Sequence, residues 1–289
     1  PHPHSGCLLR PPLLISSSPP PPARARPGPP RRLGVRRMKG QFIVDDNTLK
    51  AHIASPSAEP AGKHPGVVVA HEFPTLVSGS SSTATMAALA EHIATETGFS
   101  VLVFAARGMQ GCEGNFSLNG WRRDLVGAVD FLADSTDCEN IWIIGFGTGG
   151  ALGIRVAAAD GRIRGVASVA APADFSYWAR NPRKIVVWGR KVGVIRDEDF
   201  PASLNRWTAQ LREYNTIRSA QKLSDKDLLV IHGNDDELVP VMDARAIASA
   251  HPEPELHIIK GAKHHLRHDP RVIAILLGWL ERQRDTPHE

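Results

Sequence analysis

The chain has 289 residues, of which 42% are hydrophobic and 22% are charged, and this length allows one large domain with a sizeable core. Its formal net charge of +4 comes from residues 1–37, which hold seven of the 34 basic residues and no acidic one. The rest of the chain has 27 basic residues against 30 acidic ones, which excludes a global attraction to nucleic acid or to an anionic membrane.

The three cysteines, Cys7, Cys112 and Cys138, form no closely spaced pair. Such a sparse, odd set argues against a disulfide framework or a zinc site and favours a reducing compartment. No stretch approaches the ~20 apolar residues that a membrane helix needs. We therefore expect a cytoplasmic protein with no membrane contact.

Residues 1–37 are rich in proline, and their apolar run Leu13-Leu14-Ile15 is too short for a signal-peptide core. Such a segment buries too little apolar area to offset its ordering entropy, so we expect disorder. One interpretation is a polyproline ligand for an adaptor domain or an Arg-rich targeting segment. The other is that Met38 is the native start and the tail is not translated natively.

Residues 41–44 and 49–53 are short β-prone runs on either side of the turn cluster Asp45-Asp46-Asn47, which predicts an antiparallel hairpin at a sheet edge. After a loop at 55–64, residues 67–70 form an unbroken apolar strand. Such strands are typical of a parallel sheet that is covered on both faces.

The chain then alternates between helices and strands. Residues 78–82 offer an N-cap for a helix that ends near Gly98, residues 101–104 predict a strand, and residues 122–133 repeat the helical spacing. This alternation predicts a doubly wound sheet of the α/β class.

A helix at 149–159 and a strand at 166–169 continue the pattern, but residues 174–224 interrupt it. This segment contains Trp178, Trp188 and Trp207, and we predict a cap over the carboxyl edge of the sheet, where this architecture binds ligands. The alternation then resumes with a strand at 228–231, a helix at 241–250, an edge strand at 256–259 and a closing helix at 272–280.

Residues 141–150, Ile-Trp-Ile-Ile-Gly-Phe-Gly-Thr-Gly-Gly, predict a buried strand that leads through a glycine-rich turn into a helix. This is the frame of the nucleophile elbow G-x-S-x-G, in which a Ser, Cys or Asp occupies the strained corner. Here the corner is Gly147, which has no side chain. Gly145, Gly147 and Gly150 also have dinucleotide-fingerprint spacing, but their position in mid-chain argues against a cofactor, and we expect none.

The elbow and three further motifs resemble the α/β-hydrolase superfamily over roughly residues 41–283. Residues 66–74 (GVVVAHEFP) lead into the loop of the first oxyanion donor, residues 232–240 (HGNDDELVP) match the HGxxDxxVP turn, and residues 261–264 (GAKH) are similar to the terminal histidine loop. The order of elbow, acid and histidine is the order of this fold.

The sequence resembles two branches of the superfamily. Residues 107–114 (RGMQGCEG) are similar to the RGxGxSxG segment of serine esterases and aminopeptidases. His71-Glu72 and Gly149-Gly150 are similar to dienelactone hydrolases, which have a Cys at the elbow and a Glu in the oxyanion loop. Neither branch has glycine at the nucleophile position.

The resemblance implies an α/β-hydrolase domain at residues 38–289. Its sheet is expected to be doubly wound and mostly parallel, with an antiparallel edge hairpin and an inserted cap at about 174–224. Asp236 is the expected acid and His264 the expected base, because both hold the family positions. Asp235 is the alternative acid.

Gly147 is the vacant nucleophile position, and it excludes a covalent acyl-enzyme at that residue. Thr148 and Cys112 are poor substitutes, because the residue after the elbow contributes its backbone N–H and a thiol without an activator is inert. We expect the missing Cβ to leave space for a water that His264 deprotonates. The backbone N–H groups of Thr148 and of Phe73 or Glu72 then form the oxyanion hole.

Glu72 has two interpretations. It is a carboxylate poised at the site, as the dienelactone resemblance implies, or it is a solvated charge or the partner of Arg180 or Arg183. His264, His265 and His268 lack a third metal ligand of clear spacing, so we expect loop histidines and no metal.

Two functions remain open. The first is hydrolysis of an ester, amide or other acyl bond in a small substrate by activated water. The second is that of a catalytically inactive homologue, a pseudoenzyme that binds a ligand or a partner. In both cases the expected partner is a small-molecule acyl substrate or ligand, with no nucleic acid, and the oligomeric state is open.

Overall fold

The computed structural model describes residues 34–57, 64–75, 83–109, 111–223 and 225–285. Residues 1–33 of the predicted tail and the predicted N-cap at 78–82 lie outside the described residues. The predicted tail boundary is corrected, because the first strand starts at Val35, whose Cα partner is Pro56 in the next strand.

The strands form one sheet in the order β1-β2-β4-β3-β5-β6-β7-β8. Strands β1 and β2 pair antiparallel at one edge, β2 pairs antiparallel with β4, and all the other pairs are parallel. This arrangement confirms the predicted mostly parallel α/β sheet with its edge hairpin. The strands are β1 (Val35–Val44), β2 (Asn47–Pro56), β3 (His64–Ala70), β4 (Ser100–Phe104), β5 (Cys138–Phe146), β6 (Ile163–Val169), β7 (Asp227–Gly233) and β8 (Pro254–Ile259).

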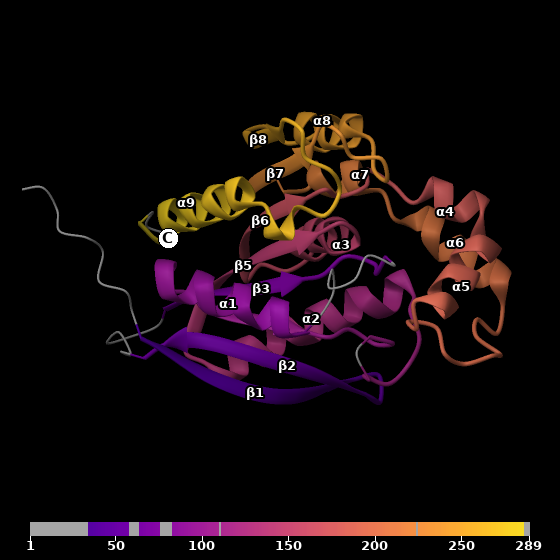
Figure 1. The fold of residues 1–289 in the computed structure, drawn as a ribbon, viewed down its shortest axis with the longest axis horizontal. Helices are drawn as coiled ribbons and strands as arrows, with labels where there is room; N and C mark the ends of the chain where they lie inside the picture. Colours follow the sequence, from indigo (N-terminus) through magenta and orange to yellow (C-terminus); the bar gives the residue numbers. More distant parts are fainter. Residues whose placement is uncertain (1–33, 58–63, 76–82, 110, 224, 286–289) are drawn as a thin grey trace, which may run out of the picture. The chain divides into compact units, whose positions relative to one another are not determined.

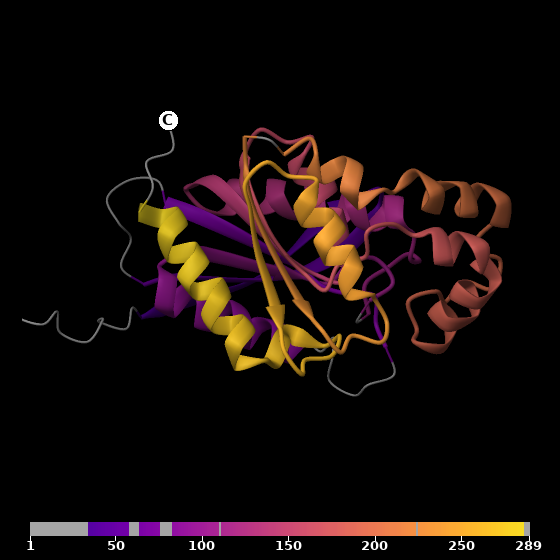
Figure 2. The same cartoon turned by 90° about the horizontal axis from the view of Figure 1, so that it is seen from above.

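Helices cover both faces of the sheet (Figures 1 and 2). The helices are α1 (Thr83–Thr97), α2 (Leu118–Ser135), α3 (Thr148–Ala157), α4 (Ser176–Arg180), α5 (Pro182–Lys191), α6 (Leu204–Glu213), α7 (Thr216–Ala220), α8 (Val241–Ser249), the 3₁₀ turn η1 (Leu266–His268) and α9 (Pro270–Asp285). Helices α1 and α9 pack together on one face, and α2, α3, α7 and α8 form the layer on the other.

The side chains of β5 explain why both layers form. Ile141 and Ile143 belong to the core cluster under α2 and α3, whereas Trp142 and Ile144 belong to the cluster under α1 and α9. Successive side chains of a strand point to opposite faces, so a continuous apolar strand needs a helical layer on each side.

The inserted cap consists mainly of α4, α5 and α6, which extend beyond the sheet at the right of Figure 1. Helix α5 buries Ile185 and Val186 and exposes Arg183, Lys184 and Arg190, the pattern of a helix with one packed face. Helix α7 contacts α3 and α8 instead, so the carboxyl-terminal part of the predicted segment 174–224 belongs to the layer on the sheet.

Candidate active site

The elbow lies where β5 ends and α3 begins. Gly147 has φ 49° and ψ −118°, a conformation that side chains disfavour, and its N–H donates to the carbonyl of Val169 at 2.8 Å. Thr148 is the first residue of α3, so its backbone N–H precedes the first intrahelical hydrogen bond. The predicted strand–turn–helix frame is therefore present.

The predicted acid and base meet at this edge of the sheet. Asp236 lies in the turn after β7, His264 lies in the loop after β8, and His264 Nδ1 is 2.8 Å from Asp236 Oδ2. The side chain of Asp236 is completely buried and that of His264 is 11% exposed. The loops that follow parallel strands thus bring together two residues that are 28 positions apart.

Further donors surround Asp236. Burial alone would raise the pKa of Asp236, but hydrogen bonds from His232, His264 and the Val239 N–H outweigh burial and hold this pKa well below its usual range. An ionised Asp236 only accepts hydrogen bonds, so His264 Nδ1 carries the proton. The lone pair of His264 is then on Nε2.

His264 Nε2 faces the elbow corner. A Cβ built on Gly147 would lie 3.6 Å from this nitrogen, which places the corner within reach of the imidazole. The same Cβ would lie only 2.9 Å from Glu72 Cβ. The space that we expected for a water above Gly147 is therefore largely filled by Glu72, a correction that follows from the close approach of the loop after β3.

The carboxylate of Glu72 is buried beside the histidines. Its Oε1 is 3.2 Å from His265 Nδ1, and its Oε2 is 3.7 Å from His264 Nε2. The Glu72 carboxylate therefore lies at the site, as the first interpretation expected. Its partners are His264 and His265, and not Arg180 or Arg183. His265 also contacts Thr75 Oγ1 at 3.2 Å, so it is not a freely solvated loop residue.

His71 fixes the loop that carries Glu72. Its Nε2 accepts the backbone N–H of Ala106 at 3.3 Å, so its Nδ1 carries the proton and donates to the carbonyl of Glu72 at 3.1 Å. Burial lowers the pKa of His71 to about 4, which keeps the ring neutral. Sequence reasoning gave this residue no role, although it stands next to Glu72.

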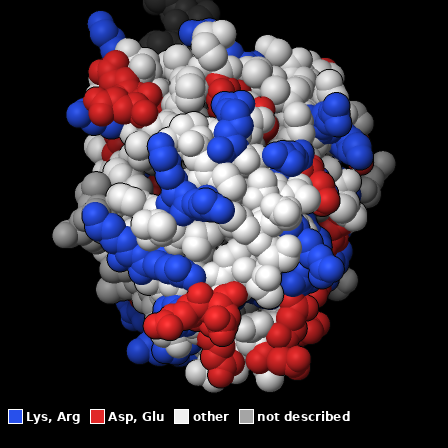
Figure 3. All heavy atoms as spheres, turned by 90° about the vertical axis from the view of Figure 1, so that its right-hand side faces the viewer, with Lys and Arg blue, Asp and Glu red and all other residues white. Residues whose placement is uncertain are grey.

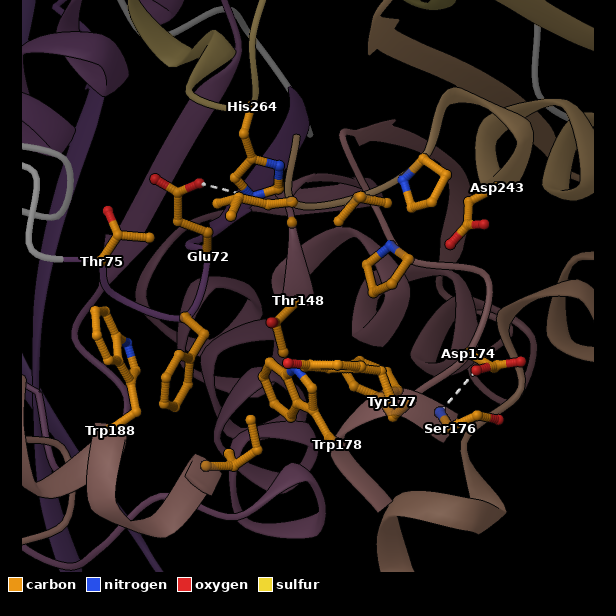
Figure 4. Close-up of a pocket in the computed structure, with 18 of the residues that line it drawn as sticks. Glu72, Thr75, Thr148, Asp174, Ser176, Tyr177, Trp178, Trp188, Asp243 and His264 are labelled. Carbon is orange, nitrogen blue, oxygen red and sulfur yellow. Dashed lines mark hydrogen bonds and ion pairs between the residues drawn. The ribbon is translucent and has the colours of Figure 1, made fainter. Parts of the chain in front are cut away.

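A cavity of about 700 Å³ opens beside the pair (Figure 4). The oxyanion candidates Glu72, Phe73 and Thr148 all lie on its wall, together with Gly147 and His264. The cap supplies Trp178 from α4 and Trp188 from α5, which Figure 4 places on the side facing Glu72 and Thr148. Aromatic walls with a few polar groups are typical of a small-molecule site.

The cavity walls are anchored to each other. The Phe73 and Trp178 ring centroids are 5.1 Å apart, and Trp188 Nε1 donates to the carbonyl of Pro74 at 3.3 Å. Two cap tryptophans thus contact the loop that carries Glu72, Phe73 and Pro74.

The family model described as the alpha/beta hydrolase family matches residues 67–275. The chain belongs to the α/β-hydrolase family. No curated protein matches its sequence.

Solved structures of other α/β hydrolases share the fold of this family member. Est1E from Butyrivibrio proteoclasticus with bound ferulic acid is 21% identical, with a TM-score of 0.63 over 84% of this chain and 97% of that one. The esterase Pf2001 from Pyrococcus furiosus is 19% identical, with a TM-score of 0.63 over 88% and 98%. The α/β hydrolase GrgF from Penicillium sp. sh18 is 18% identical, with a TM-score of 0.66 over 87% and 100%.

Among the described residues, none of the alternative catalytic groups of this α/β hydrolase is hydrogen-bonded to His264. Cys112 is buried, its Sγ contacts the carbonyl of Ala105 and the N–H of Lys50, both at 3.4 Å, and burial raises the pKa of its thiol. Asp235 is exposed, and His264 contacts Asp236 instead. In the described part of the chain, no hydrogen bond joins Thr148 to His264.

The described residues contain no group of three or more His, Cys, Asp or Glu side chains that could hold a metal ion. None of their helices has both the length and the apolar character to span a bilayer.

Proposed function

We propose that this α/β hydrolase cleaves an ester, amide or other acyl bond in a small substrate without a covalent intermediate. His264 Nε2 takes a proton from a water as the water oxygen bonds to the acyl carbon. The imidazolium then gives this proton to the leaving oxygen or nitrogen as the bond between that atom and the acyl carbon breaks. Asp236 holds the tautomer of His264 and stabilises the imidazolium that forms.

One observation supports this proposal most strongly. His264 Nδ1 is 2.8 Å from the buried Asp236 carboxylate, and Nε2 is 3.6 Å from the point where a Cβ of residue 147 would lie. A general base needs this orientation. Because Glu72 fills much of the space above Gly147, the proposed water approaches from the cavity that Gly147 and His264 both line. The N–H groups of Thr148 and Phe73 on the cavity wall are the proposed oxyanion donors. The fold shared with the esterase Pf2001 is consistent with acyl chemistry.

A second candidate function is ligand binding without turnover. It is favoured by Glu72, whose carboxylate lies 3.7 Å from His264 Nε2. A negative charge at this place opposes the build-up of an oxyanion nearby. The protein would then retain the cavity and bind a ligand there.

The experiment compares hydrolysis of a short-chain p-nitrophenyl ester by the wild type and by His264→Ala. We expect the variant to be slower by about 10²-fold or more, because it lacks the general base. His257→Ala is the matched control, since His257 lies on β8 and pairs only with Glu255 among the described residues. Equal rates of ester hydrolysis by the wild type and His264→Ala would contradict the hydrolase proposal and would favour ligand binding without turnover.

A further inference from the structure

We infer that the cavity selects ligands whose apolar or aromatic body ends in an anionic group, a carboxylate or a phosphate. Arg180 and Lys184, which line the cavity and are exposed to solvent, would hold the anion, and we call the part of the cavity that they line its mouth. This inference deepens the proposed function by naming its substrate class, but it concerns binding and is tested without turnover.

The first step is the charge of the cap beside the cavity. Residues 176–191, which include α4 and α5, contain five basic residues and no acidic one. Figure 3 faces the cap end and shows basic side chains across this side of the molecule, with acidic side chains gathered toward its borders. Of the five basic residues, only Arg180 and Lys184 line the cavity.

The second step is that Arg180 and Lys184 are exposed and available to a ligand. In the described residues, neither Arg180 nor Lys184 forms an ion pair or a side-chain hydrogen bond. Two of the other basic residues do have partners. Arg190 Nη2 donates to the carbonyl of Glu198 at 2.7 Å, and Lys191 Nζ lies 5.5 Å from the centre of the Trp188 ring.

The third step is that the carboxylates of the cavity already have donors from the protein. Glu72 contacts His265, Asp174 Oδ1 accepts the N–H of Ser176 at 2.7 Å, and Asp243 Oδ2 accepts the N–H of Ala173 at 2.9 Å. Figure 4 shows Asp174 and Asp243 at the end of the cavity away from Trp188. These carboxylates keep their charge but have donors from the protein, whereas Arg180 and Lys184 have no such partner among the described residues, so a ligand anion can pair with these two cations without displacing a contact of the protein.

The fourth step is the body of the ligand. Trp178, Trp188 and Phe73 line the cavity between the cap and the His264 loop, and Ile185 of α5 adds an aliphatic wall. An aromatic or branched apolar body packs against such walls, while its anion pairs with a guanidinium or an ammonium at the mouth.

The test measures binding by isothermal titration calorimetry with four probes of one shape. They are 3-phenylpropanoate, 2-phenylethyl phosphate, the neutral 3-phenylpropanamide and the cationic 3-phenylpropylamine. We expect at least one anionic probe to bind about tenfold more tightly than the amide at neutral pH. The two anionic probes distinguish a carboxylate ligand from a phosphate ligand.

The variants assign any preference to the mouth of the cavity. Arg180→Gln/Lys184→Gln should bind the anionic probes no better than the amide and leave the amide unchanged. Arg183→Gln is the control, because it removes an exposed charge of α5 that does not line the cavity, and it should keep the preference.

Three binding results would overturn the inference: equal affinity for the amide and both anions, tighter binding of the amine than of the anions, or no binding of either anion at millimolar concentration. A fourth would be that Arg183→Gln lowers the preference for anions as much as Arg180→Gln/Lys184→Gln does. His264→Ala should keep the anion preference, because the mouth does not depend on the base. A loss of turnover with retained preference therefore separates failure of the proposed reaction from failure of this inference.

Discussion

At the scale of single residues, the site is defined by the complementarity of Gly147 and Glu72. A Cβ at position 147 would lie 2.9 Å from Glu72 Cβ, which is not the mobile end of that side chain. The backbone at φ 49° adds strain of about 1–3 kcal/mol for any residue except glycine. We therefore expect that a serine at 147 needs a glycine at 72, which lacks the Cβ in contact, before its hydroxyl can reach His264.

His71 gives a prediction about pH. Its pKa of about 4 in the folded state is below its ordinary value near 6.5, so the unfolded chain takes up the proton first as the pH falls. The folded state should lose about 3 kcal/mol of stability between pH 6.5 and 4 through this residue. The measurement is denaturant unfolding of the wild type and of His71→Gln at pH 7 and pH 4.

The variant should show the smaller loss of stability. Asp236 does not interfere, because its lowered pKa confines its contribution to pH values below the ordinary pKa of an aspartate. The pKa of His265, raised by Glu72, acts in the opposite direction but equally in both proteins. Parallel losses in both proteins would show that His71 is not held neutral.

At the scale of elements, α3 lies close to β3 and to the loop that follows it. A Cβ at Gly149 would lie 2.6 Å from the carbonyl oxygens of Ala70 and His71, which are backbone atoms and cannot turn away. This close approach sets where the elbow stands relative to Glu72.

Gly149→Ala should therefore destabilise the protein by about 1–3 kcal/mol and lower Tm by roughly 2–10 °C. Gly161→Ala is the matched control, because nothing lies within 4 Å of the added methyl group and φ is not positive there. Differential scanning calorimetry measures both variants. Similar Tm values for the two variants would contradict the close approach of α3.

At the scale of the whole molecule, much of the fold was predictable because its signals are local. The apolar run at 141–144 and the alternation of helices and strands predict the covered parallel sheet, and the order of motifs predicts that Asp236 and His264 meet. The start of β1 was not predictable, because Arg36 and Arg37 interrupt any apolar pattern and residues 35–37 are held by pairing with β2.

The rest of the site depends on contacts between residues far apart in the chain. The position of the Glu72 carboxylate is decided by the missing Cβ at 147 and by His265, and no local pattern encodes such side-chain contacts. The helices of the cap share this limit. These helices are short and carry many polar residues, so their apolar residues showed no clear helical periodicity. Their buried faces are recognisable only from contacts such as Trp178 with Phe73 and Trp207 with Phe116.

The central claim is that acyl transfer goes directly to water and not through residue 147. The most direct measurement is the intact mass of the wild type, quenched during turnover of p-nitrophenyl acetate, with Gly147→Ser/Glu72→Gly as the variant designed to form an acyl-enzyme, because glycine at 72 removes the Cβ that a side chain at 147 would meet. We expect turnover by the wild type with no acetylated protein, and an acetyl adduct on the double variant. An acetyl adduct on the wild type during turnover, or no turnover at all, would contradict the account.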